Sequence, residues 1–114
     1  MNTRTPFYCL GDGDGVQERL ADRGIPFSEA WGAYNGFEEK SLIVFFQPLA
    51  SDFESNLLEV AGECGEESIF YCDSAGLCYF IFTDGTISRL GKIKVSKSRP
   101  DGDWTAYKGF YFYA

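Results

Sequence analysis

The sequence predicts an α+β fold with a largely antiparallel sheet of five or six strands and two helices. Aromatic residues make up 18% of the 114 residues, so the chain has enough apolar surface to form a core. Two segments in the first half carry apolar side chains at helical spacing, and residues 68–113 alternate strand-like runs with turn residues. No repeat or linker divides the chain, so we predict one domain over residues 1–114.

The first predicted elements are a strand at residues 6–10 and a helix at residues 16–23, separated by the glycine-rich loop 11–15. Gly24 follows as the C-terminal stop of the helix. Residues 25–37 hold two glycines and several aromatic side chains without a clear period, so this segment is predicted to be irregular.

A strand at residues 41–47 and the longer helix come next. Pro48 closes the strand, and residues 51–54 (Ser-Asp-Phe-Glu) match a capping box, which opens a helix that Gly65 ends. One stripe of this helix is apolar and is predicted to face the core. It consists of Phe53, Leu57, Val60, Ala61 and Cys64.

The last third of the chain is predicted to be a series of antiparallel strands joined by turns. Residues 73–76, 84–85 and 100–102 supply the glycine, aspartate and proline typical of turns. The strands between them are predicted at residues 68–72, 77–83, 86–95 and 104–113.

Strands 77–83 and 104–113 are apolar on both faces, whereas a sheet with one wet face alternates apolar with polar residues. Two helices cover about one face of such a sheet. The remaining aromatic surface, with Tyr107, Tyr111 and Tyr113, is either an interface or is buried by strong curling of the sheet itself. A two-sided apolar sheet is also compatible with a homodimer.

The net charge of −7 is unevenly spread. Residues 1–70 hold 13 acids and 4 bases, a balance of −9, whereas residues 71–114 hold 4 acids and 6 bases, a balance of +2. The pattern is typical of an acidic protein with one basic strand, or of an acidic face that attracts basic surfaces on other proteins. The overall sign disfavours general nucleic-acid binding. The basic strand carries Arg89, Lys92, Lys94, Lys97 and Arg99.

Histidine is absent, which removes the usual general base and excludes a Ser/His/Asp triad. The four cysteines show no C-x-x-C spacing, so we expect no zinc site and no cofactor. We expect reduced, mostly buried thiols, although Cys72 and Cys78 face each other across a predicted hairpin and a disulfide is a conceivable alternative. The longest uncharged stretches are far shorter than the ~20 residues of a membrane span. With no signal peptide expected either, we predict a cytoplasmic location.

Two groups of acidic residues are candidates for chemistry. Asp12 and Asp14 in the glycine-rich loop are able to hold a hard cation, but a plain loop before the helix is the favoured interpretation. Glu39 with Glu67 is a candidate pair for two-carboxylate hydrolysis, against the alternative of solvated charge beside strands.

Two motifs resemble a family of small uncharacterised proteins from bacteriophages and bacteria. Residues 32–41 are similar to its G-x-Y-x-G-x-x-E-x-S motif, and residues 65–68 to its G-Q-E-S motif, with Glu66 in place of the usual glutamine. The resemblance implies a phage setting, in which small acidic proteins often inhibit host defence, as anti-CRISPR or anti-restriction proteins do. Glu39 and Ser41 are either functional or close a structural hydrogen bond at the start of a strand, and the structural interpretation is favoured. The matching motif residues are Tyr34, Gly36, Glu39, Ser41, Glu67 and Ser68.

The leading hypothesis is a non-enzymatic, phage-encoded protein that binds and inhibits a host defence complex in the bacterial cytoplasm. The alternatives are a protein that binds or sequesters a nucleotide or small molecule, with Arg89, Lys92 and Lys94 as anion-binding residues, and a carboxylate-dependent hydrolase. In the leading hypothesis the partner binds the three tyrosines Tyr107, Tyr111 and Tyr113 and the acidic residues Asp52, Glu54, Glu59, Glu63 and Glu66.

Overall fold

The computed structural model describes residues 5–47 and 52–114. In these ranges the chain forms two helices and one sheet of nine strands. The helices are α1 (Val16–Asp22) and α2 (Phe53–Glu63). The strands are β1 (Phe7–Gly11), β2 (Ser28–Tyr34), β3 (Phe37–Phe45), β4 (Ser68–Cys72), β5 (Leu77–Phe82), β6 (Ile87–Lys92), β7 (Lys94–Ser96), β8 (Trp104–Tyr107) and β9 (Phe110–Tyr113).

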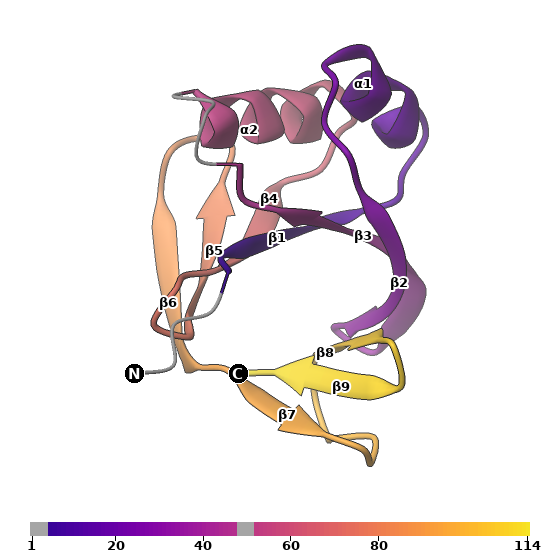
Figure 1. Cartoon of the computed structure of the whole chain (residues 1–114), viewed down its shortest axis with the longest axis vertical. Coiled ribbons are helices and arrows are strands. Elements are labelled where there is room, and N and C mark those ends of the chain that lie inside the picture. Colours follow the sequence, from indigo (N-terminus) through magenta and orange to yellow (C-terminus); the bar gives the residue numbers. More distant parts are fainter. Residues whose placement is uncertain (1–4, 48–51) are drawn as a thin grey trace.

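The sheet curls into a nearly closed barrel (Figure 1). Its strand order is β6-β5-β4-β1-β3-β2-β8-β9-β7, and every pairing is antiparallel. The two edge strands, β6 and β7, follow one another in the chain and are separated only by Ile93. The covalent chain therefore joins the two ends of the sheet where hydrogen-bonded pairing stops.

The prediction of five or six strands is wrong, because the described residues form nine. One missed strand is β2, in the segment predicted to be irregular. It forms a hairpin with β3 through Asn35 and Gly36, both of which have a positive φ (53° and 84°). An Asn-Gly pair is a strong hairpin signal, because both turn residues tolerate the left-handed conformation.

The other two extra strands arise because two predicted strands are each divided. The predicted strand 86–95 bends at the buried Ile93, whose N–H donates to the carbonyl of Gly76 (2.7 Å), so β6 pairs with β5 and β7 pairs with β9. The predicted strand 104–113 turns back at Lys108 and Gly109, with φ values of 50° and 83°, into the hairpin β8–β9. Both breaks allow the chain to close the curl rather than extend a flat sheet.

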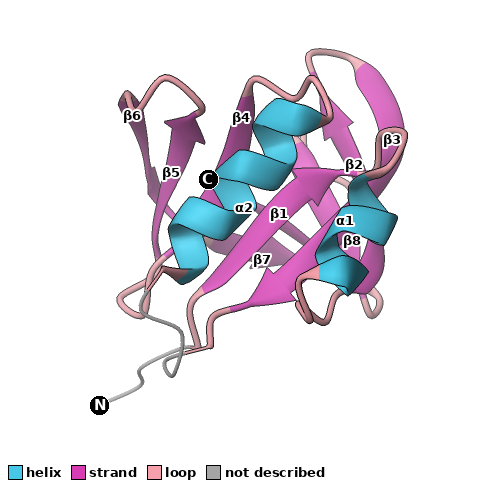
Figure 2. Ribbon diagram, turned by 90° about the horizontal axis from the view of Figure 1, so that it is seen from above, coloured by secondary structure: helices cyan, strands magenta, loops and turns pink. Residues whose placement is uncertain are grey.

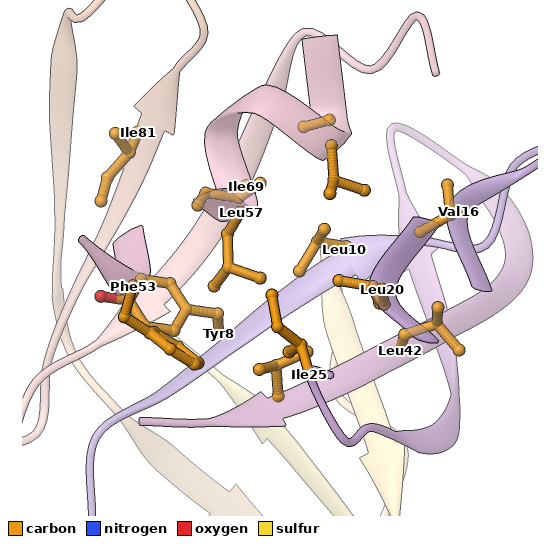
Figure 3. Close-up of a cluster of buried hydrophobic side chains, with 13 residues drawn as sticks. Tyr8, Leu10, Val16, Leu20, Ile25, Leu42, Phe53, Leu57, Ile69 and Ile81 are labelled. Carbon is orange, nitrogen blue, oxygen red and sulfur yellow. The ribbon is translucent and has the colours of Figure 1, made fainter. Parts of the chain in front are cut away.

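Both helices pack on the outer face of the curl, over β1, β3 and β4 (Figures 1 and 2). Side chains from the helices and the sheet meet there in an aliphatic core (Figure 3). The predicted capping residue Ser51 lies outside the described residues, and Asp52 occupies the N-cap position of α2. The fully buried members of this core include Leu10, Val16, Leu20, Leu42, Leu57 and Val60.

The inner face of the curl is apolar too. Side chains alternate along β1, so that of Tyr8 lies in the outer core, whereas those of Phe7 and Cys9 lie on the inner face of the sheet. A smaller buried cluster of Cys72, Cys78 and Ile93 lies within the curl, with Phe7, Phe70 and Phe112 packed against it. The strands that are apolar on both faces are thus explained by curling: helices cover one face and the sheet encloses the other.

Candidate functional site: a ring-lined cavity inside the curled sheet

The inside of the curled sheet holds a cavity of about 740 Å³. This volume lies within the range of roughly 300–1,000 Å³ typical of small-molecule sites. Barrels of this size are commonly filled by their own side chains, so a cavity here is a specific feature of the chain. Its lining comes from both sides of the curl and includes ten aromatic residues: Phe7, Tyr34, Phe45, Phe70, Phe80, Trp104, Tyr107, Phe110, Phe112 and Tyr113.

The phenylalanine rings of the wall form a contact network centred on Phe7. The ring centroids of Phe45, Phe70 and Phe112 lie 6.4, 6.2 and 6.5 Å from that of Phe7. Phe80 extends the network from Phe70, with its ring centroid at 6.1 Å. Because Phe112 reaches Phe7 from β9 on the far side of the curl, these contacts hold the opposing walls together at a ring-to-ring distance typical of stabilising aromatic pairs.

Two hydroxyl groups supply a polar end to the cavity. The Tyr34 hydroxyl and Thr105 Oγ1 hydrogen-bond to each other, and both residues line the cavity. Gly32 pairs with Thr105 in the β2–β8 register, and a Cβ at Gly32 would lie 2.6 Å from the Tyr34 ring. The missing side chain therefore allows the Tyr34 ring to lie back along β2 and reach Thr105.

The polar end is uncharged at neutral pH. Burial raises the pKa of the Tyr34 phenol above its usual range, and the neighbouring Cys9 adds to the rise. Burial also raises the pKa of the Cys9 thiol to about 12. Thr105 is 6% exposed and Ser41, next to Tyr34, is 2% exposed, whereas Tyr34 itself is half-buried and lines the cavity.

Charged side chains occur only among the exposed residues of the described lining. They are Asp101 and Asp103 in the loop before β8, and Lys108 in the β8–β9 turn. Asp103 Oδ1 accepts a hydrogen bond from the N–H of Asn35 (3.0 Å), and Lys108 Nζ lies 5.4 Å from the centroid of the Tyr107 ring. The cavity thus combines an apolar wall and an uncharged polar end with charged lining residues that are all exposed. Three further cations, Lys94, Lys97 and Arg99, lie 5.9, 6.0 and 5.0 Å from the ring centroids of Tyr113, Phe110 and Trp104.

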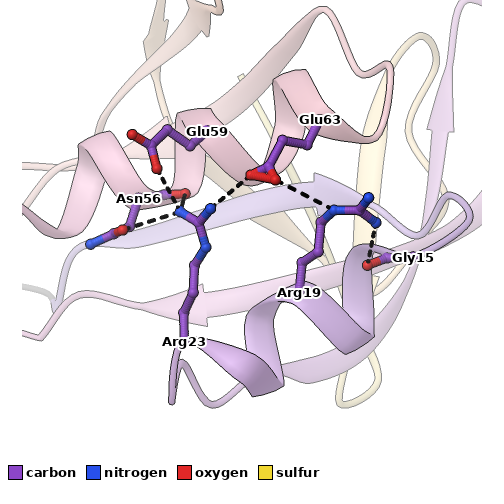
Figure 4. A network of polar contacts seen from close by, with 6 residues as sticks. All are labelled: Gly15, Arg19, Arg23, Asn56, Glu59 and Glu63. Carbon is purple, nitrogen blue, oxygen red and sulfur yellow. Dashed lines mark hydrogen bonds and ion pairs between the residues drawn. The ribbon is translucent and has the colours of Figure 1, made fainter.

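The acidic residues predicted to bind a partner lie elsewhere, on or beside α2 (Figure 4). Arg23 donates to Glu59 (2.8 Å) and Glu63 (2.7 Å), and Arg19 Nε lies 3.6 Å from Glu63. Glu54 accepts a hydrogen bond from the Tyr8 hydroxyl (3.0 Å). Part of this negative charge is therefore already matched by groups of the chain itself.

The tyrosines predicted to share that partner surface lie at the other end of the molecule (Figure 1). Tyr107 and Tyr113 line the cavity, and Tyr111 packs edge-on against Trp104 with a centroid distance of 5.0 Å. The structure therefore does not bring the acidic residues and the tyrosines together.

The predicted anion-binding residues Arg89, Lys92 and Lys94 are not among the residues that line the cavity. Arg89 and Lys92 pair with Tyr79 and Leu77 in β5. Lys94 pairs with Tyr113, and its Nζ lies 5.9 Å from the centroid of that ring.

The family-like motif residues occupy turn and strand positions in two parts of the sheet, the β2–β3 hairpin and the start of β4. Gly36 forms the β2–β3 turn, and the buried Ser41 Oγ donates to the carbonyl of Leu10 (3.1 Å) from within β3, rather than satisfying a backbone N–H at the start of a strand. Ser68 opens β4, and the preceding Glu67 accepts a hydrogen bond from the N–H of Thr83 through its carbonyl (3.0 Å). Of the six motif residues, Tyr34 alone is among the cavity-lining residues.

The two groups of candidate carboxylates are arranged differently from the prediction. Glu66, rather than Glu67, interacts with Glu39: burial raises the pKa of Glu66, and the charge of Glu39 raises it further. In the glycine-rich loop, Asp12 accepts a hydrogen bond from the Gln17 side chain (3.0 Å), and Gly15 is the N-cap of α1. Residues 5–47 and 52–114 contain no cluster of three or more metal-ligating side chains.

Three cysteines, Cys9, Cys72 and Cys78, are buried as predicted, and Cys64 is half-buried. Cys72 and Cys78 lie directly opposite each other in the β4–β5 pair. A hydrogen bond with Cys72, together with burial, raises the pKa of the Cys78 thiol. Neither described helix is long and apolar enough to cross a membrane.

Sequence reasoning missed most of the cavity wall, including Phe7, Phe70, Phe80 and Thr105. The available signal was the apolar character of both strand faces. No family model matches this chain, and no curated protein matches it either. The resemblance to a phage family therefore stays a prediction, and the function is argued from the cavity.

Proposed function

We propose that this chain is a non-enzymatic binding protein that takes up a small, largely apolar molecule inside its curled sheet. The observation that carries the proposal is the cavity of about 740 Å³ lined by ten aromatic residues. An apolar pocket with a few polar groups is the usual composition of a small-molecule site. The aromatic wall favours a flat or ring-containing ligand, because stacked and edge-on ring contacts add to the gain from apolar burial.

The test uses N-phenyl-1-naphthylamine, an uncharged dye whose fluorescence rises in an apolar environment. We expect saturable binding with one dye per chain. Ile43 lines the cavity and is 3% exposed, so Ile43→Trp places a larger side chain in the space that the dye needs. The dye should bind this variant at least about tenfold more weakly, a loss of roughly 1.4 kcal/mol.

The matched control is Ile87→Trp, because Ile87 is 63% exposed on the edge strand β6 and is not a lining residue. Its affinity for the dye should equal that of the parent chain. If Ile43→Trp loses its circular-dichroism spectrum, Leu90→Trp at the rim replaces it. Equal dye binding by the two tryptophan variants of Ile43 and Ile87, or no dye binding by the parent, would disprove the proposal.

Inhibition of a host defence complex in the bacterial cytoplasm stays a prediction from the sequence. A partner that used both the acidic residues of α2 and the tyrosines of β8 and β9 would have to reach two separate ends of the molecule. Complex formation with a basic host defence protein should weaken as salt is raised, because exposed charges are screened. An affinity that does not change with salt would contradict electrostatic recognition through α2.

A further inference from the structure

We infer that the ligand of the cavity is an uncharged, ring-containing molecule with one hydroxyl or carbonyl group, which meets Tyr34 and Thr105. This inference rests on the proposed function, because it names the chemical class of ligand for the same cavity. It combines three features of the lining: the rings, the paired hydroxyls and the placement of charge.

The rings determine the body of the ligand. Phe7, Phe70, Phe80 and Phe112 approach from four strands on two sides of the curl, with centroid distances of 6.1–6.5 Å along the network. A molecule in the space beside them exchanges water contacts for ring contacts over most of its surface. Apolar burial contributes roughly 25 cal/mol per Å², so an apolar body gains most from this wall.

The paired hydroxyls determine the polar group of the ligand. Tyr34 and Thr105 hydrogen-bond to each other, and each also has a hydrogen-bonding neighbour on the protein side, Ser41 beside Tyr34 and Cys9 beside Thr105. A hydroxyl oxygen has two lone pairs, so each keeps capacity for a further partner. Hydroxyl hydrogens rotate, so the pair is able to donate to a ligand carbonyl or to accept from a ligand hydroxyl. The two neighbours on the protein side, Cys9 and Ser41, are uncharged as well.

The placement of charge excludes an ionised group at this polar end. A buried anion is stable only beside a cation or several donors. The one cationic side chain in the described lining is the exposed Lys108, and the nearby cations Lys94, Lys97 and Arg99 lie over the rings of Tyr113, Phe110 and Trp104. The rim carboxylates of Asp101 and Asp103 repel an incoming anion. A ligand cation would be drawn to those carboxylates at the rim and would leave the hydroxyl pair without a ligand partner.

The experiment compares four naphthalene probes in competition with N-phenyl-1-naphthylamine at neutral pH. These are 2-naphthol, 2-methylnaphthalene, the anion 2-naphthoate and the cation 2-naphthylmethylammonium. One net hydrogen bond contributes roughly 1 kcal/mol, so 2-naphthol should compete about fivefold better than 2-methylnaphthalene. Both ions should compete more weakly than 2-naphthol.

Three variants test the role of the hydroxyl pair. Tyr34→Phe and Thr105→Val each remove one hydroxyl with little change in shape, and each should reduce the preference for 2-naphthol while leaving 2-methylnaphthalene binding within about twofold. The control Tyr107→Phe removes a hydroxyl from another lining ring and should keep the preference. Circular dichroism and melting temperature show whether each variant is folded.

The outcomes separate this inference from the proposed function. If the dye and 2-methylnaphthalene bind but 2-naphthol has no advantage, or if Tyr34→Phe and Thr105→Val keep that advantage, the ligand class is wrong and the cavity proposal stands. Preference for either ion would also overturn the inference. If neither the dye nor any probe binds the parent chain, both proposals fail.

Discussion

The two faces of the curled sheet are built from the same strands but are filled differently. The outer face is covered by α1 and α2, and its aliphatic side chains, such as Leu57 and Val60, are fully buried (Figure 3). The inner face carries mostly rings, and it encloses a cavity of about 740 Å³. The comparison indicates that the helices and the outer core stabilise the fold, whereas the inner face leaves the space in which we propose that a ligand binds.

The largest expected difference between the faces comes from one substitution made on each. Leu57→Ala removes a fully buried side chain from the outer core and should cost about 2–5 kcal/mol of unfolding free energy. Leu90→Ala removes the same atoms from the cavity rim, where the side chain is 38% exposed, and should cost about 1 kcal/mol or less. Urea unfolding measures both, and equal losses would show that the cavity wall is as tightly packed as the outer core.

A second comparison concerns alkaline pH, because each face contains a buried group that titrates there, a thiol on the inner face and a phenol on the outer face. On the inner face, burial raises the pKa of Cys9 to about 12. On the outer face, burial and the Glu54 carboxylate raise the pKa of Tyr8 above its usual range. As pH rises, the unfolded chain releases these protons near the ordinary thiol and phenol pKa values, whereas the folded chain retains them. Stability that is present below those ordinary values is therefore lost as pH rises toward the folded-state values.

Melting temperatures between about pH 8 and pH 11 test this expectation. The parent chain should lose stability throughout that range. Cys9→Ala should flatten the decline, because the buried thiol no longer favours the unfolded state. The half-buried Cys64 provides the control, and Cys64→Ala should leave the slope as in the parent. If the melting temperature of Cys9→Ala falls with pH as steeply as that of the parent chain, the Cys9 thiol contributes nothing to the loss of stability at alkaline pH.

The outer face was largely predictable from local sequence. Of the predicted helical stripe, Phe53, Leu57, Val60 and Ala61 are buried and Cys64 is half-buried. Spacing at 3.6 residues per turn identifies one helix face without knowledge of its partner. The strand number was not predicted. Ile93 divides one predicted strand because of its bond to the distant Gly76, which no local pattern reveals.

The inner face was predicted only as an excess of apolar strand surface. The cavity requires β8 to pair with β2, which joins residues about seventy positions apart in the chain. Such a pairing depends on the curvature of the whole sheet rather than on the composition of either strand. Tyr34 was named from a motif, but its partner Thr105 is identified only by the register of that pairing.

A smaller effect is expected from the polar network that joins α1 to α2 on the outer face (Figure 4). Arg23 donates to Glu59 and Glu63, and it also reaches the backbone and side chain of Asn56 (3.3 and 3.1 Å). Its side chain is 27% exposed, so Arg23→Ala should cost about 1 kcal/mol at low salt and less at high salt. Lys40→Ala breaks only the more exposed pair with Glu29 (3.2 Å) and should cost less. Urea titrations at two salt concentrations measure the unfolding free energies of both variants. An equal loss of stability in the two variants would show that the Arg23 network stabilises the chain no more than a single exposed ion pair does.

The smallest effect on stability is expected at Glu66, which lies between the end of α2 and the start of β4. Burial and the charge of Glu39 raise the pKa of Glu66, so as pH rises the unfolded chain ionises this carboxyl before the folded chain does. Stability that is present below the ordinary glutamate pKa is therefore lost as pH rises through the raised value. Glu66→Gln keeps an uncharged side chain at every pH. It should melt slightly higher than the parent at pH 7 and equally at about pH 3.5, where both side chains are neutral.

The control for this prediction is the exposed neighbour Glu67, since Glu67→Gln should follow the parent at both pH values. A Glu66→Gln chain that melts below the parent at pH 7 would contradict this expectation, because it would mean that the charged carboxylate stabilises the folded chain.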